Sequence, residues 1–246
     1  MKSPPENVPW GWRAAIGLPL AHLAIQIVLA LGGSSLLLVV LWATSRLNPD
    51  NLQAWAASGV FVGSIGILGG LVSLALIYAV TTGLRKRPFR ATIKWVRSGR
   101  LWPVVLGAVL LGGALDTVTV AMHKPIVPDV LRPMFQGYAA AAVMTVFAVI
   151  VTPVVEEILF RGVMYPVSAR SLGVPGGVAL VSLLFGLAHV ATYGVDVYLV
   201  GQTLVAGLYL TWLRARTESL VPSVAAHAAL NLYATLEAIV IVNMWK

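Results

Sequence analysis

The sequence predicts an all-α protein, a polytopic helical bundle that crosses a membrane about seven times. Hydrophobic residues make up 59% of the 246 positions and charged residues only 11%, whereas soluble proteins contain about 45–50% and about 25%. Apolar runs near the length needed to cross a bilayer recur along the chain. A membrane span must satisfy its own backbone hydrogen bonds, and no segment alternates as barrel strands do, so the spans are expected to be helices.

Seven apolar stretches are interpreted as membrane spans. In chain order they cover residues 16–43, 59–83, 101–121, 137–166, 176–194, 197–213 and 220–245. The segment SLGVPGG at 171–177 is predicted to form the turn between the fourth and fifth spans, and the proline-rich segment 123–134 an external loop. Because the remaining loops are short, residues 1–246 are expected to form a single membrane domain.

The net charge of +8 is explained by membrane topology. If the chain starts in the cytosol, 13 Lys and Arg residues, Lys2 among them, fall on the cytosolic side, and only Arg46, Lys124, Arg132 and Lys246 on the other. This asymmetry follows the positive-inside rule and predicts a cytosolic N-terminus. The basic segment 85–100 is expected to face anionic lipid headgroups. Nucleic-acid binding is not expected, because no stacking platform accompanies the basic residues. Cysteine is absent, which excludes thiol nucleophiles and disulfides.

Three charged residues lie within the apolar sequence VVEEILFRG at 154–162. A charge at the centre of a membrane helix costs ~2.5–3.5 kcal/mol on insertion scales, so such residues need partners or a watery cavity. Glu157 and Arg161 are four residues apart with the acid first, the favourable order for an ion pair. Glu156 points about 100° away from Glu157 on a helix. Glu156 therefore lacks a partner on its own helix and is a candidate general base.

Two further polar pairs follow on later spans. Phe185 and His189 in FGLAHV, and His227 and Asn231 in HAALN, are each one helical turn apart. Glu156 and His189 are nearly equidistant from the predicted turn near residue 172, so an antiparallel hairpin would bring them to the same depth. If the chain also reverses direction after the fifth and after the sixth predicted span, residue 231 lies close to the same depth in the membrane. Each group alone is compatible with simple helix association, but their common level predicts one polar site.

The pieces EEILFR, FGLAH and HAALN resemble the motifs EExxxR, FxxxH and HxxxN of the CAAX protease and bacteriocin-processing family of intramembrane proteases. This family, also called the abortive-infection family, includes type II CAAX prenyl endopeptidases. The resemblance covers about residues 137–235 and implies a protease core there, preceded by variable helices in residues 1–136. It also implies an intramembrane endopeptidase that is either glutamate-dependent or a metalloprotease.

The resemblance implies a role for each motif residue. Glu156 would activate a water with help from His189, and His227 and Asn231 would stabilise the oxyanion. The supporting residues would be Glu157, Arg161 and Phe185. Catalysis without a cofactor is the first choice. The alternative is a zinc ion held by Glu156, His189 and His227, although the HExxH spacing that makes zinc the default is missing.

The expected substrate is a membrane-embedded or membrane-associated peptide or protein. By the resemblance, it would be processed in CAAX-type, bacteriocin or pheromone maturation, or in self-immunity. The loop-poor sequence favours a bacterial protein, integral to the cytoplasmic membrane. One alternative function is a non-catalytic scaffold or peptide-binding membrane protein, whose polar cluster serves helix association. A transporter is a third hypothesis, supported by Asp116, an acid in a predicted span outside the motifs.

Overall fold

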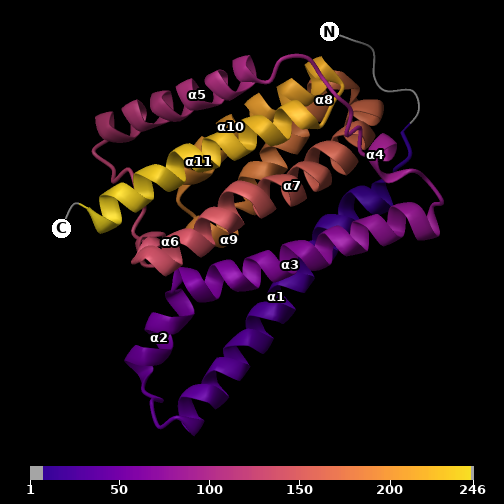
Figure 1. Cartoon of the computed structure of the whole chain (residues 1–246). Coiled ribbons are helices and arrows are strands. Elements are labelled where there is room, and N and C mark those ends of the chain that lie inside the picture. The colour runs from indigo at the N-terminus through magenta and orange to yellow at the C-terminus, as the bar shows by residue number, and fades with distance from the viewer. Residues whose placement is uncertain (1–7, 245–246) are drawn as a thin grey trace.

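The computed structural model describes residues 8–244, without the side chains of Pro49 and Ala191. Over this range the chain is helical with short connections and contains no strand, which confirms the all-α fold class (Figure 1). Lys2 and Lys246, which entered the charge count, lie outside the described residues. The long helices are α1 (Trp12–Ala43), α3 (Gly59–Ala79), α5 (Trp102–Ala121), α8 (Tyr165–Ala188), α10 (Val197–Thr217) and α11 (Val221–Asn243).

Shorter elements join the long helices or continue them. The α-helical ones are α2 (Pro49–Ala57), α4 (Phe89–Thr92), α6 (Tyr138–Thr145), α7 (Thr152–Glu157) and α9 (Val190–Tyr193). The π-helical ones are η1 (Val80–Leu84), η3 (Val146–Val151) and η4 (Ile158–Met164), and η2 (Arg132–Phe135) is a 3₁₀ helix.

The predicted count of seven spans is not confirmed. Within residues 8–244, five helical segments are long and apolar enough to cross a membrane, by length and composition: Trp12–Ala43, Gly59–Leu84, Trp102–Ala121, Tyr138–Ala188 and Val221–Asn243. The predicted fourth and fifth spans, 137–166 and 176–194, lie largely within the single 51-residue segment Tyr138–Ala188. The predicted sixth span is helical as α10 but is not among the five, since the polar residues along α10 lower its mean hydropathy.

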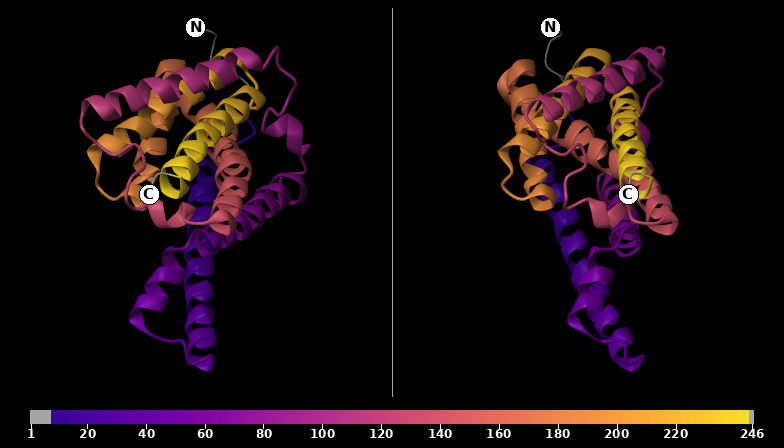
Figure 2. Two further views of the ribbon diagram at one scale, coloured as in Figure 1. Left: turned by 60° about the vertical axis from the view of Figure 1, so that its left-hand side comes forward. Right: turned by 90° about the vertical axis from the view of Figure 1, so that its left-hand side faces the viewer.

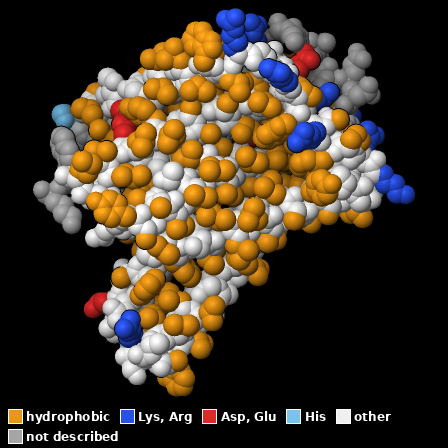
Figure 3. Space-filling model, in the orientation of Figure 1, with side chains coloured by type: hydrophobic (Ala, Val, Ile, Leu, Met, Phe, Trp, Pro, Cys, Tyr) orange, Lys and Arg blue, Asp and Glu red, His pale blue; other side chains and the backbone are white. Residues whose placement is uncertain are grey.

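The helices form a main body and a projecting hairpin. In Figures 1 and 2, α2 and the adjoining half of α1 extend away from the other helices, while α5, α8, α10 and α11 lie together in the body. Helix α10 packs against α8, and α11 packs against α5. Apolar side chains cover most of the face in Figure 3, and Lys and Arg side chains gather toward one end of the body. This distribution is the one expected of a bundle surrounded by lipid.

Two prolines explain the π-helical stretches before and after Glu156. The N–H of Thr152 donates to the carbonyl of Phe147, five residues back, and Pro153 follows directly. The same pattern recurs where the N–H of Tyr165 donates to Phe160, directly before Pro166. A proline within a helix removes a donor and clashes with the preceding turn, and a widened π turn accommodates the ring without ending the helix.

The predicted turn at 171–177 is a sharp bend at one residue. Gly173 adopts φ 73° and ψ 167°, a conformation that residues with a side chain rarely adopt. Helical conformation resumes immediately, and Gly177 lies so close to Ala169 that an added Cβ would be 2.7 Å from the Ala169 backbone nitrogen. The two glycines therefore fold the halves of α8 back on each other. This bend directs His189, at the end of α8, toward the region of Glu156.

Candidate active site

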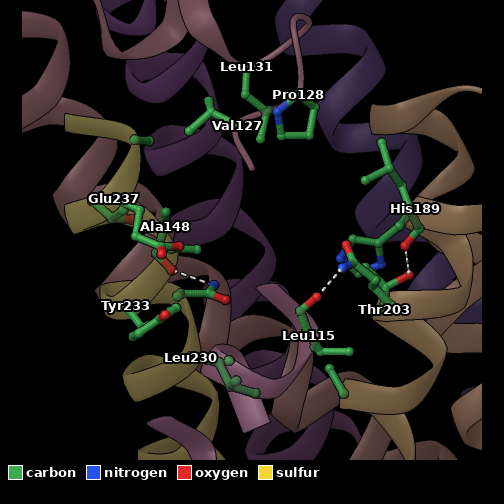
Figure 4. A pocket seen from close by; sticks show the side chains of 18 of the residues that line it. Leu115, Val127, Pro128, Leu131, Ala148, His189, Thr203, Leu230, Tyr233 and Glu237 are labelled. Carbon is green, nitrogen blue, oxygen red and sulfur yellow. Dashed lines mark hydrogen bonds between the residues drawn. The ribbon is translucent and has the colours of Figure 1, made fainter. Parts of the chain in front are cut away.

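A cavity of about 380 Å³ lies within the main body and is lined by residues of α5, α7, α8, α10 and α11. In Figure 4, His189 and Thr203 lie on one side of it, and Tyr233 and Glu237 on the opposite side. The residues that the sequence predicts to be catalytic, together with Phe185, all line this cavity: Glu156, His189, His227 and Asn231. Three segments far apart in the chain therefore contribute these residues to one site.

Glu157 and Arg161 form the buried ion pair predicted from their spacing. Nη1 of Arg161 donates to Oε1 of Glu157 at 2.8 Å, and both side chains are 0% exposed. The other guanidinium nitrogens donate to Thr211 Oγ1 at 3.1 Å and to the Gly207 carbonyl at 3.1 Å, which ties α7 and η4 to α10. A buried charge requires such complete partnering, because an uncompensated one is strongly destabilising.

Phe185 connects this ion pair to the histidines. The guanidinium carbon of Arg161 lies 4.2 Å from the centre of the Phe185 ring, a cation–π contact. The same ring is 4.8 Å from the ring of His189 and meets the ring of His227 edge-on at 5.7 Å. Phe185 therefore packs beside His189 and also separates the ion pair from the cavity.

Glu156 has an environment unlike that of its neighbour Glu157. Its side chain is 21% exposed, and its Oε2 atom lies 3.8 Å from Nε2 of His227, beyond hydrogen-bond distance. Oε2 is inaccessible to solvent and has no hydrogen-bond partner among the described residues. The adjacent carboxylates thus differ in environment. Oε1 of Glu157 accepts from Arg161 and His227, while its Oε2 is buried without a partner among the described residues. Glu156 makes no hydrogen bond to the described residues and lines the cavity.

The hydrogen bonds of the two histidines determine which ring nitrogen carries the proton. Nδ1 of His227 lies 2.9 Å from Oε1 of Glu157, an oxygen that accepts, so this nitrogen donates. Nδ1 of His189 lies 2.8 Å from the carbonyl oxygen of Phe185 and must donate as well. In the neutral tautomers that these partners select, both Nε2 atoms carry lone pairs. Each can accept a hydrogen bond or a proton in the cavity.

Asn231 supports the π-helical turn before Glu156. Its Nδ2 donates to the carbonyl of Ala148 at 2.7 Å. Within the widened turn, the donor for that carbonyl would be the N–H five residues later, and residue 153 is a proline without one. One of the two amide hydrogens of Asn231 is therefore committed to the backbone, and the other is available.

The cavity also contains polar residues that lie outside the three motifs. Tyr233 donates to Oδ2 of Asp116 at 2.6 Å, joining α11 to α5, and Glu237 is close enough to interact with both. Tyr193 stacks on His189 with ring centres 6.0 Å apart. Sequence analysis had singled out Asp116 but passed over Tyr193, Tyr233 and Glu237. An acid within a predicted span, as Glu237 is, was the signal that could have identified the second cluster.

The arrangement does not provide a ready-made metal site. The residues considered for zinc are Glu156, His189 and His227, and no group of three His, Asp or Glu side chains within residues 8–244 is placed to hold a metal ion. The Nδ1 hydrogen bonds of both histidines resemble the outer-shell bonds that orient metal ligands. The carboxylate of Glu156, however, does not form with the two imidazoles a group of three possible ligands.

Comparisons with known proteins agree with the motif pattern. The sequence model of the family described as "Type II CAAX prenyl endopeptidase Rce1-like" matches residues 138–233, the region that contains all the motif residues. No curated protein and no solved structure matches the chain. The family match confirms the resemblance predicted from the motifs and supports a protease. Together with the apolar helices, it indicates an integral membrane protein.

Proposed function

We propose that this chain, whose residues 138–233 match an Rce1-like family model, is an intramembrane endopeptidase that uses Glu156 to activate a water molecule. The observation that carries the proposal is the contrast within the Glu156–Glu157 pair. Glu157 is 0% exposed, is bonded through Oε1 to Arg161 and His227, and does not line the cavity, whereas Glu156 is 21% exposed, lines the cavity and makes no hydrogen bond to the described residues. A general base needs an oxygen free to accept a proton.

In this mechanism, a water binds between Glu156 and the Nε2 acceptors of the histidines. Glu156 takes one proton as the water oxygen attacks the carbonyl carbon of the scissile peptide bond, which forms a tetrahedral oxyanion. The C–N bond then breaks, and Glu156 returns the proton to the leaving amine. The free N–H of Asn231 donates to the oxyanion, and Nε2 of His227 can do so when that ring is protonated.

The substrate is a peptide that reaches the cavity from the bilayer. The cavity is lined in part by apolar side chains, Ile126, Val127, Leu131, Phe135, Met144 and Phe147 among them, and its carboxylates are Asp116, Glu156 and Glu237. Candidate substrates are prenylated CAAX peptides, the class in the family description, and unmodified hydrophobic bacteriocin or pheromone precursors. A bacterial cytoplasmic membrane with the N-terminus in the cytosol is the proposed location, and the loop-poor sequence favours the unmodified peptides.

A cleavage assay with purified protein in lipid nanodiscs tests the proposal. The probes are fluorescence-quenched peptides, one set farnesylated at a CAAX cysteine and one set unmodified and hydrophobic. The wild-type protein should cleave at least one probe, and Glu156→Ala should abolish cleavage while protein yield and unfolding temperature are unchanged. Asp129→Asn is a matched control, because Asp129 is an exposed carboxylate outside the cavity whose contact is a surface pair with Arg132. Unchanged cleavage by Glu156→Ala would overturn the assignment and favour a non-catalytic protein or another base.

A further inference from the structure

The cavity needs a hydrogen-bond donor for an oxyanion, and the motif residues supply few. In their neutral forms, the rings of His189 and His227 present lone pairs at Nε2, because both Nδ1 atoms already donate. Asn231 has one amide hydrogen committed to Ala148. A tetrahedral oxyanion is ordinarily stabilised by donors positioned before the reaction begins. An additional donor outside the three motifs would complete the stabilisation of the oxyanion.

Tyr193 has the required properties. Tyr193 is the last residue of α9, the short helix that begins directly after His189. It lines the same cavity as Glu156. Its hydroxyl makes no hydrogen bond to any of the described residues, whereas the hydroxyls of Tyr198, Tyr209 and Tyr233 each have a partner. Burial, and then the negative charge of Glu156, raise the pKa of Tyr193 above its usual value of 10.0. The hydroxyl therefore keeps its proton at neutral pH.

The position of Tyr193 is fixed by a row of rings. Phe185, His189 and Tyr193 are successively four residues apart, and their ring centres are separated by 4.8 Å and 6.0 Å. The planes of His189 and Tyr193 differ by only 21°, so the two rings stack. Gly194, with φ 67°, ends the helix immediately afterwards. The stack holds the phenol beside His189, which lines the same cavity as Glu156.

We propose that Tyr193 is a further catalytic residue, whose hydroxyl donates a hydrogen bond to the oxyanion formed when water adds to the scissile carbonyl. This inference rests on the proposed function. The phenol donates without any prior change of protonation, unlike His227, and no proton leaves Tyr193 during the reaction. Its contribution is to stabilise negative charge in the transition state rather than to bind the substrate in its ground state.

The variant Tyr193→Phe tests this role, because it removes the hydroxyl and keeps the ring that stacks on His189. With the best-cleaved probe peptide, kcat should fall by about 10²–10³-fold, the usual effect of losing one oxyanion donor, while KM changes little. A phosphonate analogue of that peptide, which has a charged oxygen at the oxyanion position, should bind the variant more weakly by a similar factor. A ring that serves only to support His189 would leave both quantities at wild-type values.

Tyr209→Phe is the matched control. The hydroxyl of Tyr209 donates to the carbonyl of Val104 at 2.9 Å and does not line the cavity. This variant should keep the wild-type kcat, and the unfolding temperature of Tyr193→Phe should equal that of the wild type. If the wild type and Tyr193→Phe cleave the probe with the same kcat, the assignment of Tyr193 is overturned while the proposed function stands. If the wild type cleaves no probe, both are overturned.

Discussion

Nδ1 of His227 donates a hydrogen bond to Oε1 of Glu157 at 2.9 Å, and this contact couples the buried ion pair to the cavity. The same oxygen accepts from Arg161. Because Glu157 holds one edge of the imidazole, the opposite edge is directed at Glu156, with Nε2 at 3.8 Å from Oε2. Glu156 thus faces the imidazole ring of His227, and Glu157 orients that ring.

Loss of the Glu157 charge should destabilise the protein strongly. Glu157→Gln leaves the guanidinium of Arg161 buried without its counter-ion, a change that typically costs about 3–5 kcal/mol in folding free energy. Glu156→Gln should change the folding free energy little, because among residues 8–244 the carboxylate of Glu156 has no Lys or Arg partner and lies 3.8 Å from Nε2 of His227. Reversible unfolding in detergent, followed by circular dichroism, measures both. Equal destabilisation by the two substitutions would contradict the division of roles between these residues.

Much of the site could be predicted from helical spacing. The four-residue separation of Glu157 and Arg161 gave their ion pair, and the symmetric placement of Glu156 and His189 about residue 172 placed them in one cavity. The bend occurs at Gly173, within the predicted turn. These predictions were correct because they depend on local geometry and on the burial cost of charge, both of which the sequence determines directly.

Other features depend on tertiary contacts that local patterns do not contain. The bond from Asn231 to Ala148 joins residues 83 positions apart and arises from a π turn, which periodicity at 3.6 residues does not reveal. The predicted count of seven spans is not confirmed, because polar residues lower the mean hydropathy of α10 and because the fourth and fifth predicted spans fall in one continuous helical segment. Tyr193 becomes a candidate hydrogen-bond donor only because the Nδ1 donors of His189 and His227 and one amide hydrogen of Asn231 are already engaged in tertiary or backbone contacts.

Asn231 should stabilise the turn before Glu156 in addition to any role in catalysis. Asn231→Leu leaves the Ala148 carbonyl without the donor that Pro153 cannot replace. Because this contact is only partly buried, the loss should be at the lower end of the range of about 1–3 kcal/mol that an unsatisfied buried polar group costs. Unfolding measurements should show this loss. The matched test is a double-mutant cycle with Pro153→Ala, which restores a backbone N–H at residue 153. The effect of Asn231→Leu should be smaller in that background, and an equal effect would refute this account of the bond.

The start of α10 should depend on pH through Asp196. Its side chain accepts from the N–H groups of Leu199 and Tyr198 and pairs with Lys124 at 3.3 Å. The hydrogen bond from Leu199, followed by Lys124 and Tyr198, lowers the pKa of Asp196 below its usual value of 3.8, despite some desolvation. The stabilisation is therefore complete above the unfolded-state pKa and is lost as the pH falls through the lower folded-state pKa.

Asp196→Asn isolates this charge effect, since asparagine is also a good N-cap residue. The wild type should have the higher unfolding temperature at neutral pH, and the difference should shrink as the pH is lowered below about 4. Thermal unfolding of both proteins across this range provides the measurement. A difference that stays constant down to the lowest pH would show that the carboxylate charge has no part in stabilising α10.

Cleavage should continue after treatment with a chelator. Both histidines at the site hold their Nδ1 protons on protein oxygens and present Nε2 as acceptors, which suits a water activated by Glu156. The three side chains considered for zinc do not converge on one point within residues 8–244. Dialysis against EDTA should therefore leave kcat unchanged for the best-cleaved probe, with Glu156→Ala as the inactive reference. Loss of activity in EDTA, followed by recovery with one equivalent of Zn²⁺ per protein, would instead show that Glu156, His189 and His227 rearrange around a metal.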